Sequence, residues 1–477
     1  MNVLIWFKRD LRCQHHPALR LGHQMGRVLP LYIVEPDYWQ LPETSARQWE
    51  FTAECLTELR DDLKAMGATL IVRTGDALTC LEKLCRQHHI ARIISHEETG
   101  NTWCVARDCR VAEWCQTAGV EWRVVPQPGE SELVIEEDTS PPIAGLMAVE
   151  GLESGPIPSF KSLKMKHDPC PHRQIGGRSQ GLLQLNSFLQ VRAETYSVDA
   201  TSPLTAERTC SRVSAHLALG TLAISEVVTQ TGLRQAEHGS RNWRNSLARF
   251  QRQLGLREHF LALPDRQSLV ENWANSAQLG AQNVGFLEHR SDPLAAWRAG
   301  KTGLPFLDAC MRYLRATGWL NFAMRSLVLQ AATEGLGVDA YQAALHLARS
   351  TTDYDPRLHW AQVLTSLDTQ TTRPAPALQP VKRGMKHDPN GVFIRRWVPE
   401  LASVPAEFIH EPWKWPGFYA AIGQRYFAPM VQQPQRTGNT RRAPPALQRA
   451  TSARGFARIP AQHHSQTHRG AQLVMDV

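Results

Sequence analysis

Two short segments in the second half of the chain carry side chains that could bind a charged ligand. Residues 210–220 read Cys-Ser-Arg-Val-Ser-Ala-His-Leu-Ala-Leu-Gly, with two hydroxyls and an arginine at the start of an apolar helix. Free amides at a helix N-terminus, together with hydroxyl donors, favour a phosphate group. The same Ser-x-x-Ser spacing is typical of an ordinary helix cap, so this segment leaves both interpretations open.

The second segment holds two carboxylates, Asp353 and Asp355, just before the helix-breaking Pro356. Paired acids of this kind occur at functional sites, and they are also common in capping turns. Residues 300–312 contain Gly-Lys-Thr, but the upstream glycine of a nucleotide P-loop is missing and no strand precedes them. We therefore exclude a P-loop there.

The elements that must position these residues change in character along the chain. Residues 1–125 alternate short apolar runs with helical periodicity, which predicts a parallel sheet with helices on both faces, a doubly wound α/β domain. A G-x-G-x-x-G fingerprint is absent after the first strand. The expected strands are 3–7, 28–34, 69–73, 91–96 and 121–125, and the expected helices are 48–66, 77–88 and 103–118.

Four regions follow from these patterns. Residues 1–128 form the α/β domain, and residues 129–181, rich in Pro, Gly and Ser, form a connector. Residues 182–430 are predicted to be an all-α domain. Residues 431–477 hold seven arginines and one acid, so we expect a basic, disordered tail that supplies most of the net charge.

Composition narrows the class of protein. A chain of 477 residues with 42% hydrophobic residues can bury substantial cores, which excludes a wholly disordered protein. A net charge of +8 and 14 tryptophans fit a partner rich in phosphate and stackable rings, although a basic surface can also serve solubility alone. No secretory signal or membrane span is evident, so we expect a cytoplasmic monomer.

The ten cysteines include no C-x-x-C pair, and none follows Cys310. We expect reduced thiols and no metal, since a zinc ribbon or an iron–sulfur cluster in the C-terminal third would lack its thiolates.

Six motifs, in order along the chain, together resemble the photolyase/cryptochrome flavoproteins. They are Trp6-Phe-Lys-Arg-Asp-Leu-Arg12, Ser211-Arg-Val-Ser214, Lys301-Thr-Gly303 through Met311-Arg312, Gly318-Trp319, Asp353-Tyr-Asp355, and Phe393 to Leu401 with His410-Glu-Pro-Trp413. The resemblance runs from residue 1 to about residue 416. It implies an FAD-binding helical domain and light-driven repair of pyrimidine dimers in UV-damaged DNA, a carbon–carbon lyase reaction of the deoxyribodipyrimidine photo-lyase type. The alternative it leaves open is a cryptochrome-like blue-light sensor without repair activity.

By the same resemblance, a set of residues should surround the FAD. Asp353 pairs with Arg325 beside the flavin, and His359 faces flavin N5, where its imidazole could exchange a proton near neutral pH. The remaining expected contacts are Tyr196, Ser211, Arg212, Val213, Ser214, Phe250, Arg257 and Asp355.

The DNA-facing positions depart from the family pattern. Leu256 and Thr365 stand where lesion-side tryptophans are usual, and Gln253 replaces a glutamate typical of cyclobutane-dimer enzymes. Phe322-Ala323 replaces an Asn-Arg pair that reaches DNA. Losing two stacking surfaces, at roughly 1–3 kcal/mol each, would weaken lesion binding unless other groups compensate.

The electron relay and the antenna site are altered as well. Of three relay tryptophans only Trp297 matches, because the other positions read Ala340 and Val363. Trp103 and Cys104 stand where folate-binding relatives carry Asn-Glu. The sequence therefore leaves the identity of any antenna chromophore open.

Overall fold

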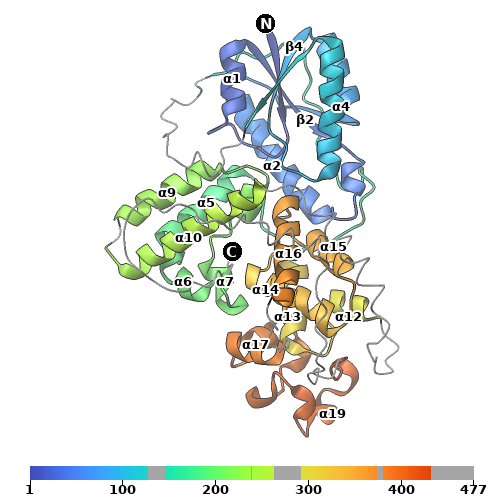
Figure 1. The fold of residues 1–477 in the computed structure, drawn as a ribbon, viewed down its shortest axis with the longest axis vertical. Helices are drawn as coiled ribbons and strands as arrows, with labels where there is room; N and C mark the ends of the chain where they lie inside the picture. The colour runs from blue at the N-terminus through green and yellow to red at the C-terminus, as the bar shows by residue number, and fades with distance from the viewer. Residues whose placement is uncertain (127–142, 144, 238, 263–291, 373–379, 431–477) are drawn as a thin grey trace.

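A computed structural model describes residues 1–126, 143, 145–237, 239–262, 292–372 and 380–430, with residues 368–372 described by their backbone alone. Within these ranges, an α/β unit at the N-terminus sits on a larger helical unit (Figure 1). The predicted connector lies partly outside the described residues, and the predicted tail lies wholly outside them.

Five parallel strands form one sheet in the order β3-β2-β1-β4-β5. This order reverses its direction at β1, as in doubly wound folds, so the predicted class and all five strands are confirmed. The strands are β1 (Asn2–Phe7), β2 (Arg27–Val34), β3 (Ile71–Thr74), β4 (Ile90–His96) and β5 (Glu121–Val125).

Alternation along β1 shows why helices cover both faces of the sheet. Val3, Ile5 and Phe7 pack into one buried cluster with residues of α1 and α2, whereas Leu4 and Trp6 pack into another with residues of α3 and α4. Those helices are α1 (Pro17–Met25), α2 (Ala46–Ala65), α3 (Ala77–Gln87) and α4 (Thr102–Ala118). The sequence-based helices are confirmed, and α1 is an addition to them.

The helical unit begins at α5 and buries one large apolar core. Its first group is α5 (Arg178–Gln190), α6 (Tyr196–Asp199), α7 (Pro203–Thr209), α8 (Ser214–Ala218), α9 (Ile224–Glu237) and α10 (Arg241–Leu261). Its second group is α12 (Pro293–Ala299), α13 (Pro305–Thr317), α14 (Phe322–Gln330), α15 (Ala340–Ser350), α16 (Pro356–Thr372), α17 (Pro380–His387), α18 (Val392–Trp397) and α19 (Phe418–Ala421). The two groups lie side by side below the sheet (Figure 1).

Hydrogen bonds to backbone carbonyls join the two units where β1 ends. Leu11 donates its amide to the carbonyl of Leu219 at 3.0 Å, and Arg12 donates from Nη1 to the carbonyl of Gly220 at 2.9 Å. Arg9 reaches further, from Nη2 to the carbonyl of Tyr354 at 2.9 Å. The Trp6–Arg12 motif therefore anchors the α/β unit on the segments that carry the two candidate ligand sites of the sequence.

All ten cysteines fall within the described residues and are free thiols, as the sequence predicts. None of the described helices has the length and apolar character needed to cross a membrane.

Candidate functional site

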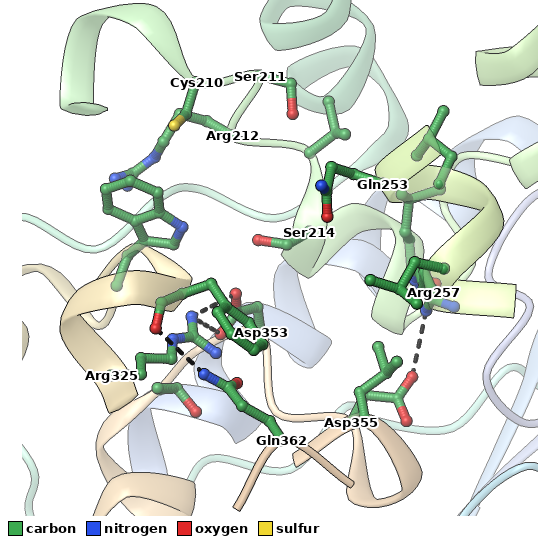
Figure 2. A pocket seen from close by; sticks show the side chains of 18 of the residues that line it. Cys210, Ser211, Arg212, Ser214, Gln253, Arg257, Arg325, Asp353, Asp355 and Gln362 are labelled. Carbon is green, nitrogen blue, oxygen red and sulfur yellow. Dashed lines mark hydrogen bonds and ion pairs between the residues drawn. The ribbon is translucent and has the colours of Figure 1, made fainter. Parts of the chain in front are cut away.

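A cavity with about 1100 Å³ of empty volume lies between the two groups of helices. Figure 2 shows the side chains that point into it, with the Ser211–Ser214 segment on one side and the two aspartates on the other. The residues predicted from the sequence that line it are Tyr196, Ser211, Arg212, Val213, Ser214, Phe250, Gln253, Leu256, Arg257, Phe322, Arg325, Asp353, Asp355 and His359. Chain folding thus gathers positions more than 160 residues apart around one space.

The wall predicted to bind phosphate is the turn between α7 and α8. Arg212 adopts a left-handed backbone conformation with φ of 62°, and its guanidinium lies 3.9 Å from the centre of the Trp319 ring. Arg192 donates from Nη2 to the carbonyl of Ser211 at 3.2 Å. Burial lowers the pKa of Arg192, and the nearby Arg212 charge lowers it further. Arg212 lines the cavity and Arg192 does not, so Arg212 is the cation of this wall that favours an anion in the cavity.

Both aspartates carry an arginine partner. Arg325 donates from Nη2 to the two carboxylate oxygens of Asp353, at 2.8 and 2.7 Å. Arg257 donates from Nη2 to Oδ2 of Asp355 at 3.1 Å. The Asp353–Arg325 contact has the geometry that the resemblance implies, and the dashed lines of Figure 2 mark both pairs. A pairing cation is what a nearly buried carboxylate needs to remain charged.

His359 also lines the cavity, and its environment corrects one expectation. Nε2 lies 3.0 Å from the carbonyl of Ala344, which can only accept, so Nε2 carries the proton and Nδ1 is the free lone pair. Burial, reinforced by the charge of Arg325, lowers the pKa of His359 to about 3. The near-neutral titration expected from the sequence is therefore wrong, because the imidazole stays neutral down to acidic pH.

Aromatic side chains form the apolar wall. Phe250 contacts Phe188 edge-on with ring centres 4.8 Å apart, and Tyr196 packs against both. Phe250 is only 4% exposed although it lines the cavity. This phenylalanine, which replaces the family's tryptophan, therefore keeps a flat ring at the predicted position.

Two predicted residues lie elsewhere. Trp297 is fully buried on α12, where Nε1 donates to the carbonyl of Val328 at 3.1 Å and the ring contacts His346. Thr365 on α16 donates its hydroxyl to the carbonyl of Ala361 at 2.8 Å. Neither is among the residues that line the cavity. Thr365 points along its own helix because a helical threonine readily bonds to the carbonyl four residues earlier.

Sequence reasoning missed several lining residues. Gln362 and Leu358 lie on α16 beside His359, and Tyr354 stands between the two aspartates. Gln362 follows His359 by three residues, so the two side chains lie on the same helix face. This spacing would have indicated that Gln362 also lines the cavity. The other unpredicted lining residues are Cys210, Leu217, Leu254, Phe260, Trp319 and Thr351.

Buried polar atoms in the cavity wall lack protein partners within the described ranges. They are Ser214 Oγ, Gln253 Oε1, Tyr354 Oη and Asp355 Oδ1. An unpaired buried polar atom costs about 1–3 kcal/mol, so such atoms are expected where a ligand completes the bonding. Together with the paired arginines and the flat apolar wall, these atoms fit a ligand that combines phosphate, hydroxyl and aromatic groups, as FAD does.

A second, smaller cavity of about 560 Å³ opens at the carboxyl ends of β1 and β2. Its charged side chains already pair with protein: Arg107 contacts Glu35 at 2.8 Å and also Glu98, and Lys8 contacts Asp108 at 2.8 Å. Burial would raise the pKa of Glu98, but Lys8 and Arg107 outweigh it and hold the value at about 2. Any antenna chromophore in this cavity would meet a wall of nearly balanced charge.

Asp10, His16 and His96 bring three potential metal ligands within 4.8 Å of one another in the α/β unit. His16 Nδ1 accepts from the amide of Leu19 at 2.9 Å, so its proton sits on Nε2, which faces Asp10 at 3.0 Å. His96 Nδ1 lies 2.6 Å from the same carboxylate oxygen. Both ring nitrogens therefore face one Asp10 carboxylate oxygen at hydrogen-bond distance.

Comparisons with known proteins agree with this geometry. The family model for DNA photolyase matches residues 3–128, and that for the FAD binding domain of DNA photolyase matches residues 250–443. A deoxyribodipyrimidine photo-lyase from Streptomyces griseus is 29% identical and covers 90% of this chain and 96% of its own length. A cryptochrome DASH from Gloeobacter violaceus is 26% identical, with 87% and 88% covered.

Solved structures share the fold. A cryptochrome from Synechocystis superposes with a TM-score of 0.74 at 21% identity, covering 90% of this chain and 96% of that one. A class III photolyase from Agrobacterium tumefaciens gives a TM-score of 0.73 at 22% identity, covering 90% and 94%. The chain belongs to the photolyase/cryptochrome family and carries that family's FAD-binding domain.

Proposed function

We propose that this protein repairs UV-induced pyrimidine dimers in DNA, using light to drive an electron from reduced FAD to the lesion. The observation that carries the proposal is the position of α10. This helix lines the cavity with Gln253, Leu256 and Arg257, and it also carries five arginines against one acid. Arg241, Arg244 and Arg252 among them are exposed. Arg252 directly precedes the lining residue Gln253, so this exposed cation near the cavity suits a phosphate backbone whose base enters the cavity.

Each charged residue has a distinct task in this proposal. Bound FAD would supply the light-driven electron donor of the reaction. The Ser211–Ser214 turn, with the Arg212 side chain that lines the cavity, holds the phosphates. Arg325 and Asp353 form a fixed pair that orients the polar edge of the bound group. His359, neutral and hydrogen-bonded to Ala344, carries no extra proton that it could transfer to a nearby anion.

The lesion is gripped by different groups from those usual in the family. Gln253 has a buried Oε1 without a protein partner in the described chain, which suits a donor on a flipped base. Leu256 and Phe322 supply apolar surface for its ring. A flipped base is easier to extract when it is damaged, because it is already poorly stacked.

The test uses purified protein loaded with FAD and reduced chemically in the dark. Blue light should then remove cyclobutane dimers from an oligonucleotide, while a dark sample should not. A parallel substrate with a (6-4) lesion identifies which damage is accepted. If neither lesion is lost under light while FAD is bound and reduced, the repair proposal is wrong.

A blue-light sensor is the second candidate, and the composition of the cavity rim favours it. Leu256 offers less stacking surface than tryptophan, and Thr365 does not line the cavity. A sensor should show a light-dependent change in partner binding without lesion loss. Undamaged and dimer-containing duplexes bound with equal affinity would support this candidate over repair.

A further inference from the structure

Aromatic rings lead away from the flavin cavity in the described structure along a path that lacks the usual relay tryptophans. His359 lines the cavity, and its ring lies 5.1 Å from that of Trp360. Trp360 in turn stacks on Tyr341, with ring centres 5.6 Å apart and planes within 15°. Trp360 is fully buried, whereas Tyr341 is partly exposed. The stacked pair therefore joins the cavity wall to the surface in two steps.

We propose that Trp360 and Tyr341 relay electrons from the protein surface to the light-excited flavin. One electron leaves the indole of Trp360 for the flavin, and Tyr341 then gives one electron to the indole radical cation. Tyr341 is partly exposed, and its phenol releases its proton to water. An external thiol returns one hydrogen atom to the tyrosyl radical. The inference rests on the proposed function only in requiring bound FAD.

A second series of rings starts at the cavity and is less suited to this task. Trp319 lines the cavity, and its ring centre lies 6.3 Å from that of Tyr313. The Tyr313 ring centre lies in turn 5.2 Å from that of Trp397. The Arg212 guanidinium sits 3.9 Å over the Trp319 ring and within 3.4 Å of the Tyr313 hydroxyl. A fixed positive charge at that distance opposes formation of a radical cation on either ring. No such cation lies over Trp360 among the described residues.

Trp297 does not offer a comparable route. Its ring contact is with His346, which is not a cavity residue, and burial lowers the pKa of that histidine to about 3. The indole is fully buried, so it cannot exchange an electron with a soluble thiol by direct contact. The Trp360–Tyr341 pair combines contact with the cavity wall and access to solvent.

The test illuminates FAD-loaded protein with blue light in oxygen-free buffer that contains dithiothreitol. The rate at which the flavin absorption band bleaches measures photoreduction. Trp360→Phe and Tyr341→Phe should each slow bleaching by an order of magnitude, and Trp397→Phe, a matched control on the other series of rings, should not. Tyr341→Phe keeps the stacked ring and guards against a folding defect in Trp360→Phe. Unchanged rates in both relay variants, or slowing in Trp397→Phe alone, would overturn the proposal.

Two further measurements separate this relay from repair itself. After a laser flash, time-resolved absorption should detect a tyrosyl radical in the parent protein and lose it in Tyr341→Phe. A persisting tyrosyl signal would contradict the assignment. With FAD reduced by dithionite in the dark, the relay is bypassed, so Trp360→Phe should repair dimers like the parent. Failure of the reduced parent itself would count against the proposed function and leave the photoreduction result standing.

Discussion

Arg325 and Asp353 face each other across the cavity wall, with both carboxylate oxygens within 2.8 Å of one guanidinium nitrogen. The side chain of Asp353 is 6% exposed and that of Arg325 is 17% exposed. Arg325→Met should therefore lower the free energy of unfolding by about 3 kcal/mol, because a nearly buried carboxylate loses the cation that pairs with it. Urea denaturation of the FAD-free parent and variant proteins measures this loss of unfolding free energy.

The matched control for that pair is Arg396→Met. Arg396 contacts Glu207 at 3.4 Å, but both side chains are largely exposed. Removing this pair should cost less than about 1 kcal/mol. Equal losses in the two variants would contradict the assigned role of burial.

Ser214→Ala should separate ligand binding from folding. Ser214 Oγ is buried without a protein partner in the described chain, so its removal should leave the unfolding of the FAD-free protein unchanged. If the hydroxyl bonds to FAD, the Kd should rise about tenfold, equivalent to one lost hydrogen bond of about 1.4 kcal/mol. Fluorescence titration with FAD gives the Kd.

Ser246→Ala provides the opposite pattern. Its hydroxyl accepts from the amide of Ser197 at 3.0 Å and donates to the carbonyl of Glu194 at 2.9 Å. This variant should unfold at lower urea and change FAD affinity less than Ser214→Ala. The Ser214 proposal fails if its variant loses stability without losing affinity.

Acidification should destabilise the protein below about pH 6.5. Burial lowers the pKa of six described histidines, among them His16 and His216 to about 4, and His346 and His359 to about 3. Between those values and 6.5 the unfolded chain binds more protons, so stability falls as pH falls, by about 1.4 kcal/mol per pH unit for each histidine. Above pH 6.5 these groups contribute no slope. Urea midpoints at pH 7 and pH 5 measure the effect, and His346→Asn should reduce it.

Gly220→Ala should weaken the junction between the two units. Gly220 has φ of +63°, and an added Cβ would lie 2.3 Å from the carbonyl oxygen of Arg9 and 2.7 Å from Asp10 Cα. Backbone must therefore move, in addition to a strain of about 1–2 kcal/mol for a left-handed alanine. Gly119→Ala, with φ of +69° and open space around its Cβ, isolates the strain alone. Thermal melts should show the larger loss at Gly220, and equal losses would count against the close contact.

Leu256→Trp should restore a stacking surface at the cavity. Binding of a dimer-containing oligonucleotide should tighten by about 1–3 kcal/mol, the usual value of one stacked base, while binding of undamaged duplex should change little. Leu183→Trp, at a 59% exposed site on α5, controls for added aromatic surface. Fluorescence anisotropy reports both affinities. Tighter binding of both duplexes in both variants would indicate nonspecific adhesion.

The amino-acid sequence by itself determined the α/β unit and named many, but not all, of the residues that line the cavity. Alternating apolar residues predict strands such as β1, because one side chain in two must find an apolar partner on each face. The ordered motifs named most of the residues that the cavity brings together. Local apolar patterns and short motifs suffice for these predictions because each depends on residues that are close together in the chain.

Only the tertiary structure decided the state and the contacts of those residues. A motif match places His359 at the site, but its lowered pKa arises from burial and from Arg325, 34 positions earlier in the chain. The stacking of Trp360 on Tyr341 joins two helices whose rings no spacing rule relates. Electrostatic environment and ring contact depend on packing between distant segments, which is why the sequence could name the participants but not their protonation or their path.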